Sequence, residues 1–464
     1  MVFPTVEFAI FFPIVLALSW ALMSRQQVWK PFMLAASYAF YSAANPLFCL
    51  MLAGITLGNQ AASKLIHGSE DERFRRRIVI AAVALNLATL GVFKYYGFFA
   101  TEVNGVLDSA GLGLPVPLAA IALPIGISFI VFQAITYTVD VKRRVIEPAS
   151  TIDAALYLSF FPHLVAGPIV RAREFMPQLA AARDPRNVAL GAGIFLIMVG
   201  LVKKVAVADS LAREIVDPVF AVPQAYSAPD VVLAAYGYAV QVFCDFSGYT
   251  DMAIGTALLL GFVFPQNFRS PFGSTSFREL WQRWHITLSR FLRDFLYIPL
   301  GGNRGGRRKT ARNVMITMTL GGLWHGASWG PVLWGAIHGA ALVGEQFFRE
   351  REWRPPMWLR WFIVFHVFVL ALVIFRASTI GIAMAFLGRM LEPGPATLWT
   401  FPIVAVIVGM IAYQCVPQRP LDELRLRIEQ LHPAALGASM AAVILLVAAT
   451  VSSQGVPPFI YFQF

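Results

Sequence analysis

The sequence predicts an all-helical, polytopic integral membrane protein, and three observations support this fold class. Apolar residues fill 58% of the 464 positions. Charged residues fill only 14%, whereas an average soluble protein has about 25%. Apolar runs of about 20 residues, the length that crosses the hydrocarbon core of a bilayer, recur along the whole chain. These values exclude a disordered or collagen-like chain and argue against a soluble globular one.

The apolar runs give the expected membrane helices in order. The expected spans are 7–23, 32–57, 78–100, 118–139, 188–208, 232–262, 313–345, 358–378, 400–416 and 434–451. Asn45-Pro46 is expected to break the second run, and glycines are expected to break 313–345. Segments 152–170 and 380–391 are shorter and are expected to be re-entrant or interfacial, which gives about 10–12 membrane helices. No stretch is left for a soluble domain, so residues 1–464 are expected to form one transmembrane domain.

The first run follows a start that lacks a basic region and a small-residue cleavage site, so it is expected to be a retained span. Three loops are rich in lysine and arginine, namely 63–77, 140–150 and 417–433. Three loops contain neither residue, namely 101–117, 217–231 and 452–464. The positive-inside rule places the first group in the cytoplasm, and both termini are then expected on the outer face.

The net charge of +11 suits either nucleic acid or a membrane surface. The basic residues cluster between apolar runs, which favours membrane lipids as the partner and argues against nucleic acid. The most basic stretch is 263–312, where ten lysines and arginines stand against two acidic residues. Interleaved aromatic residues predict interfacial helices that either anchor the protein to lipid or bind an anionic cytosolic ligand.

The strongest candidate for a reactive group is His325, in the segment Leu-Trp-His-Gly-Ala-Ser-Trp (323–329) of an apolar run. Polar side chains are costly at membrane depth and therefore mark functional sites by default. A buried imidazole stays neutral, so it can act as a general base for a hydroxyl that attacks an activated acyl group. Trp324, Ser328 and Trp329 are expected to line a narrow tunnel. The alternative is tight helix packing through the flanking glycines, with His325 bonded to a neighbouring carbonyl.

Other polar side chains near this segment are candidates for binding the acyl donor or for lining the tunnel. His285 is expected either to supply a second catalytic group or to be a structural residue at the inner membrane surface. Asp245 interrupts an apolar run, so it must be paired, protonated or in contact with water, and Arg283 is one possible partner. The remaining candidates are Tyr249, Trp284, Ser289 and His338. The cysteine and histidine spacing does not indicate a metal site.

Seven ordered stretches carry a family resemblance. They are Pro-His-Leu-Val-Ala-Gly-Pro-Ile (162–169), Asp-Phe-Ser-Gly-Tyr-Thr-Asp-Met-Ala-Ile-Gly (245–255), Asn-Phe-Arg-Ser-Pro-Phe (267–272), Arg-Trp-His-Ile-Thr-Leu-Ser (283–289), Arg-Asp-Phe-Leu-Tyr-Ile-Pro-Leu-Gly-Gly (293–302), Gly-Leu-Trp-His-Gly-Ala-Ser-Trp (322–329) and Pro-Phe-Ile-Tyr-Phe-Gln-Phe (458–464). Over most of its length the chain thus resembles the membrane-bound O-acyltransferase (MBOAT) family, and within it the bacterial alginate O-acetylation (AlgI-like) branch.

The resemblance implies an MBOAT fold and acyl transfer across the bacterial inner membrane. A cytoplasmic thioester donor, expected to be acetyl-CoA, would give its acyl group to a hydroxyl reached from the outer side. The family histidine of the tunnel corresponds to His325, and the other family histidine corresponds to His285. A periplasmic or extracellular partner acetyltransferase would then complete the O-acetylation of an exported polysaccharide. No tightly bound cofactor is implied.

Three other functions remain open from the sequence. A D-alanyl (or other acyl) transferase would take its acyl group from a carrier-protein thioester and modify a cell-wall polymer. A polysaccharide or lipid transporter would use the intramembrane polar residues only to line a path. A non-catalytic scaffold for outer-face acetyltransferases would still support acetylation after loss of His325.

Overall fold

The structure is a computed structural model that describes residues 3–113, 115–118, 121–165, 167–351, 355–451, 457 and 459. Every regular element within these ranges is a helix, which confirms the predicted all-α class. Of the motif at 458–464, only Phe459 lies within the described residues.

Among the described residues, five helical stretches are long and apolar enough to cross a membrane: Glu72–Ser109, Leu190–Ala221, Ala228–Leu259, Met357–Arg376 and Pro433–Thr450. Three further apolar helices are shorter, namely Val6–Leu22, Ile380–Arg389 and Phe401–Cys415. The protein is thus an integral membrane protein, as predicted, while the full number of about 10–12 membrane helices stays a prediction.

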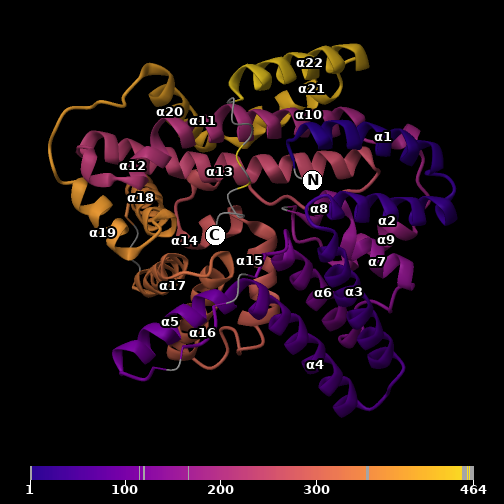
Figure 1. Ribbon diagram of the computed structural model, residues 1–464. Helices are drawn as coiled ribbons and strands as arrows, with labels where there is room; N and C mark the ends of the chain where they lie inside the picture. The colour runs from indigo at the N-terminus through magenta and orange to yellow at the C-terminus, as the bar shows by residue number, and fades with distance from the viewer. Residues whose placement is uncertain are drawn as a thin grey trace. The chain divides into compact units, whose positions relative to one another are not determined.

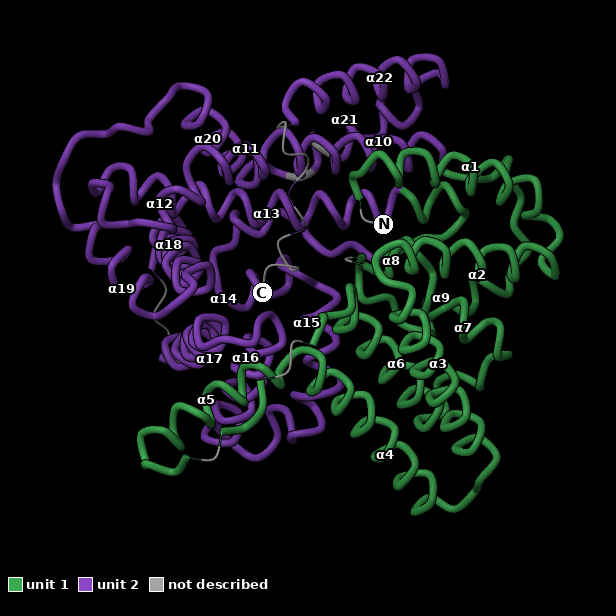
Figure 2. The backbone as a smooth tube through the Cα atoms, in the orientation of Figure 1, with its two compact units in different colours: residues 1–189, 256–264 green, residues 190–255, 265–464 purple. Residues whose placement is uncertain are grey.

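The chain divides into two compact units, coloured separately in Figure 2: residues 1–189 with 256–264, and residues 190–255 with 265–464. The helices of the first unit are α1 (Val6–Leu22), α2 (Gln26–Ser42), α3 (Pro46–His67), α4 (Glu72–Leu90), α5 (Tyr96–Ser109), α6 (Ile127–Lys142), α7 (Thr151–Ser159), α8 (Phe161–Leu164) and α9 (Ala172–Ala180). The prediction of one functional domain over residues 1–464 stays a prediction.

The second unit carries the segments that the sequence marks as chemically interesting. Its helices are α10 (Leu190–Leu201), α11 (Asp209–Leu211), α12 (Asp217–Ala221), α13 (Ala228–Leu259, which counts with the first unit from residue 256), α14 (Phe277–Arg283), α15 (Ile286–Leu292), α16 (Arg307–His325), α17 (Trp329–Glu350), α18 (Met357–Arg376), α19 (Ile380–Arg389), α20 (Phe401–Cys415), α21 (Gln418–Glu429) and α22 (Pro433–Thr450). A π-helical turn, η7 (Arg293–Tyr297), follows α15.

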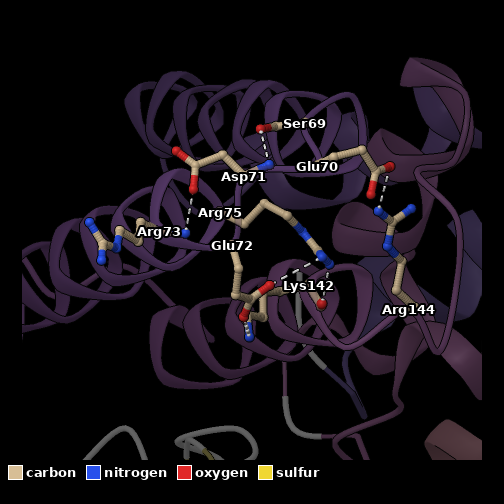
Figure 3. A network of polar contacts seen from close by, with 8 residues as sticks. All are labelled: Ser69, Glu70, Asp71, Glu72, Arg73, Arg75, Lys142 and Arg144. Carbon is tan, nitrogen blue, oxygen red and sulfur yellow. Dashed lines mark hydrogen bonds and ion pairs between the residues drawn. The ribbon is translucent and has the colours of Figure 1, made fainter.

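In the first unit, the predicted break at Asn45-Pro46 is confirmed. The side chain of Asn45 accepts a hydrogen bond from the Leu47 amide at 2.9 Å, so the chain breaks after α2 and α3 begins at Pro46. The basic loops 63–77 and 140–150 meet in one polar network, where Arg144 pairs with Glu70 at 3.0 Å (Figure 3). Because they meet, the two loops share one side of any bilayer that this unit spans.

In the second unit, α16 and α17 form the hairpin that the sequence predicts as a glycine-broken run (Figure 1). A Cβ atom added to Gly322 would lie 2.2 Å from the carbonyl oxygen of Pro331. One added to Gly335 would lie 2.3 Å from the carbonyl oxygen of Met318. Only glycine allows backbones to approach this closely, so these two positions set the spacing of the hairpin that carries His325.

Candidate active site

A cavity of about 790 Å³ opens in the second unit between α14, α15, η7, α16 and α17. Its basic lining residues are Arg278, Arg290, Arg293 and Arg349. Within the described ranges, Arg278, Arg290 and Arg349 take part in no ion pair. The acidic lining residue Glu345 is occupied, because its carboxylate accepts a hydrogen bond from the Phe277 amide. The cavity therefore offers free guanidinium groups to an anionic ligand.

The helix faces that line the cavity continue toward two histidines. On α16 the lining residues Thr310, Val314 and Thr317 follow one face. On an ideal helix that face continues to His325, about 12 Å beyond Thr317. On α17 the lining face formed by Arg349, Glu345 and Leu342 continues in the same way to His338, about 6 Å beyond Leu342.

His325 is 2% exposed and lies among aromatic rings. Ring centroids of Trp324 and Trp334 are 5.0 and 5.1 Å from its imidazole, and that of Phe375 is 5.8 Å away. The cavity lining includes Trp281 but not His325. Trp281 packs on Trp334 at 5.5 Å, and Trp334 packs on His325, so a chain of ring contacts joins the cavity lining to His325. The predicted tunnel to His325 stays a prediction.

His285 lies beside His325, with 6.1 Å between the ring centroids. Its Nδ1 donates to the Asn267 side-chain carbonyl at 3.1 Å, because that oxygen also accepts from the amide and hydroxyl of Thr287 and is therefore an acceptor. This bond leaves Nε2 of the neutral ring as the basic nitrogen. Nε2 has no hydrogen-bond partner among the described residues. Burial lowers the pKa of His285 to about 3, so the ring is neutral at pH 7.

His285 also has a strained backbone. Its φ of +42° lies in the left-handed region, between the end of α14 and the start of α15. Non-glycine residues rarely adopt this conformation, and it is over-represented at functional sites. Here it turns the chain so that the imidazole contacts Phe246 of α13 at 4.7 Å and Trp324 of α16 at 5.9 Å.

His338 is fully buried and packs against Trp281, Trp334 and Phe368, with ring centroids 5.3, 4.9 and 5.8 Å away. Neither of its ring nitrogens finds a hydrogen-bond partner in the described part of the chain. The predicted site residue His338 is therefore brought next to Trp334, the ring that also contacts His325.

Not all of the other predicted residues of the basic segment and of the α16–α17 hairpin line the cavity. Ser289 lines the cavity, as predicted. Arg283 does not: it pairs with Glu279 at 2.6 Å within α14. Trp284 is 3% exposed and packs on aromatic rings of the core rather than on the cavity. Trp329 is 50% exposed at the start of α17, and Ser328 is half-buried just before it.

Asp245 and Tyr249 lie on α13 in the second unit. The carboxylate of Asp245 pairs with Lys204 at 2.6 Å, and Lys204 also pairs with Asp209 at 2.7 Å. Lys204, rather than the suggested Arg283, is therefore its cationic partner, which favours a fold-stabilising role. Tyr249 is 1% exposed and packs on Phe459 at 4.4 Å. Neither residue lines the cavity.

Sequence reasoning missed four residues of this site: Trp281, Trp334, Asn267 and Arg349. Trp334 precedes His338 by one helical turn, so the i, i+4 spacing was a usable signal. Trp281 stands in the same motif as His285 and carried no separate signal. The contact between Asn267 and His285 joins residues 18 positions apart across a loop, and only the folded chain reveals it.

Comparisons with known proteins assign the chain to a family. The sequence profile of the membrane-bound O-acyltransferase family matches residues 130–386, more than half of the chain. The chain belongs to this family. The matched range of the MBOAT profile contains the whole lining of the cavity and the three clustered histidines. As a member of the family, the protein is an O-acyltransferase.

Curated relatives of this MBOAT protein include three informative matches. The probable alginate O-acetylase AlgI of Pseudomonas putida is 36% identical, covering 98% of this chain and 98% of its own length. That of Pseudomonas aeruginosa is 40% identical over 81% of this chain and 71% of its own. The peptidoglycan O-acetyltransferase of Helicobacter pylori is 35% identical over 78% of this chain and 73% of its own.

Proposed function

We propose that the protein moves an acetyl group from cytoplasmic acetyl-CoA across the membrane for the O-acetylation of an exported polysaccharide, with His325 as the catalytic residue and His285 assisting. The relatives named as alginate O-acetylases and peptidoglycan O-acetyltransferase support an acetyl group and a polysaccharide acceptor. One observation carries the proposal for this chain: a cavity with free arginines lies on the helix faces that continue to His325.

The charge of the cavity suits a donor that carries phosphates. Acetyl-CoA bears several phosphate charges at one end and the reactive thioester at the other. Guanidinium groups bind phosphates with two parallel hydrogen bonds, so Arg278, Arg290 and Arg349 would hold the phosphate end in the cavity. The thioester would then point along α16 toward His325.

The histidines supply the proton transfer that this reaction needs. The acceptor hydroxyl oxygen forms a bond to the acetyl carbon while the carbon–sulfur bond breaks. The hydroxyl proton passes to the imidazole of His325 and then to the leaving thiolate, so the products are an ester and free coenzyme A. Nε2 of His285, neutral and unprotonated, provides a second base 6.1 Å away by ring centroids. General-base help of roughly 10²–10⁴-fold plus positioning suffices for an activated thioester.

The proposal extends to the membrane and to the partners of the protein. In a bacterial inner membrane, the cytoplasmic face would carry the basic loops 63–77 and 140–150, which lie together in the first unit. Both termini would then lie on the outer face. There, a periplasmic or extracellular acetyltransferase would receive the acetyl group and complete the modification of the polysaccharide.

The test replaces His325 by alanine and follows labelled acetyl groups from acetyl-CoA in membranes that contain equal amounts of protein. We expect acetyl transfer to fall to background. His67→Ala is the matched control, because this imidazole is exposed at the end of α3, and it should leave transfer unchanged. Full transfer by His325→Ala would refute the catalytic assignment and favour a scaffold. Movement of a substrate across the membrane that persists in this variant would favour a transporter. Transfer only from a carrier-protein thioester would exclude acetyl-CoA as donor.

A further inference from the structure

Four buried nitrogens beside the cavity have no hydrogen-bond partner among the described residues: Nδ1 and Nε2 of His338, Nε1 of Trp281 and Nε1 of Trp334. They belong to one cluster, since the three rings lie 4.9–5.5 Å apart by centroids. Buried polar groups are nearly always hydrogen-bonded in native proteins. Four such atoms in one cluster point to a polar partner that the described residues do not supply.

The hydrogen-bonding capacity of this cluster is well defined. A neutral imidazole has one donor and one acceptor nitrogen, and each indole has a single donor. The cluster of His338, Trp281 and Trp334 therefore offers three donors and one acceptor. An amide beside a carbonyl matches this set, because it presents two acceptor oxygens and one donor N–H. The last two polar groups of the pantetheine arm, the cysteamine amide and the thioester carbonyl, have this composition.

The length of the arm agrees with this match. Twelve bonds separate the phosphate oxygen from the sulfur, as in roughly four extended residues, which gives about 14 Å. Along α17, the cavity-lining residue Arg349 is about 16 Å from His338, because 1.5 Å separates successive residues of a helix. A phosphate held by the arginine would thus place the thioester close to His338 and Trp334.

We propose that His338, Trp281 and Trp334 form the subsite that binds the cysteamine amide and thioester carbonyl of a pantetheine donor. This subsite rests on the proposed acyl transfer and specifies which groups of the donor are recognised. It positions the acetyl carbon beyond Trp334, on the side of His325, whose ring contacts the same indole at 5.1 Å. Coenzyme A and a carrier protein both carry the acyl group on a pantetheine arm, so the subsite fits either donor.

The experiment measures competition against labelled acetyl-CoA bound to the purified full-length protein. The competitors are acetyl-CoA, S-acetyl-phosphopantetheine and an acetyl-CoA analogue in which a methylene replaces the cysteamine N–H. We expect the wild-type protein to bind the methylene analogue about 10-fold more weakly than acetyl-CoA, the usual effect of one lost hydrogen bond to a buried partner. His338→Phe keeps the aromatic packing and removes both nitrogens, so it should bind the two compounds equally.

Two further variants make the result specific. His338→Gln restores a donor and an acceptor, and it should recover part of the discrimination. Phe368→Leu alters the packing around His338 at a ring without polar atoms, and it should keep the wild-type discrimination. If the wild-type protein binds acetyl-CoA but does not distinguish the methylene analogue, the subsite is wrong while the proposed function stands. If labelled acetyl-CoA does not bind, the measurement is repeated with labelled S-acetyl-phosphopantetheine and its own methylene analogue. A 10-fold preference for the thioester over that analogue would then support the subsite and indicate a carrier-protein donor. If it binds neither thioester, both proposals are overturned.

Discussion

Replacing Gly322 by alanine tests whether the spacing of the α16–α17 hairpin controls the reaction. The new Cβ atom would lie 2.2 Å from the Pro331 carbonyl oxygen, whereas ordinary contacts begin at 3.4 Å. The two backbones must therefore separate by about 1 Å. Overpacking of this kind costs roughly 1–3 kcal/mol of stability. A displacement of about 1 Å in a catalytic geometry can lower the rate by roughly 10²-fold.

The assay follows acetyl transfer per mole of folded protein, together with the thermal unfolding midpoint in detergent. Gly344→Ala is the matched control on α17, because its added Cβ would meet nothing within 4 Å. We expect the control to keep the wild-type rate and midpoint, and Gly322→Ala to lower both. If Gly322→Ala matches the wild-type protein in both measurements, the close approach of the helices does not position His325, and the reasoning is refuted.

Three other variants test separate parts of the site. Lys204→Met leaves the buried carboxylates of Asp209 and Asp245 without their cation, so the free energy of unfolding should fall by about 3–5 kcal/mol. A denaturation curve that matches the wild-type curve would contradict this prediction. Asn267→Asp places a negative charge beside Nδ1 of His285, which raises the low pKa of that ring by roughly 1–3 units. The protonated ring is no longer a base, so the acidic limb of the pH–rate profile should move to higher pH; superposable profiles would argue against a role for His285. Arg349→Ala should raise the KM for acetyl-CoA by roughly 5- to 10-fold at low salt and leave kcat unchanged, whereas an unaltered KM would exclude a phosphate contact.

The sequence predicted the helical elements and the burial of His325. The break at Asn45, the break within the run 313–345 and the short helices near 152–170 and 380–391 all appear in the structure. These predictions succeeded because hydropathy, capping and glycine placement act over a few neighbouring residues. The same local signals identified His325, since a polar residue in an apolar run stands out without any knowledge of its neighbours.

The tertiary structure alone decided which side chains meet. Trp334, and not only the neighbouring Trp324, packs on His325; Lys204 rather than Arg283 pairs with Asp245; and Asn267 orients His285. Arg349 of α17 lines the same cavity as the arginines of the consecutive elements α14, α15 and η7, although it lies far along the chain from them. Hydropathy reports how each residue interacts with lipid or water, and it carries no information on which distant segment will pack against it. Those pairings depend on the crossing and close approach of helices, and only the folded chain defines them.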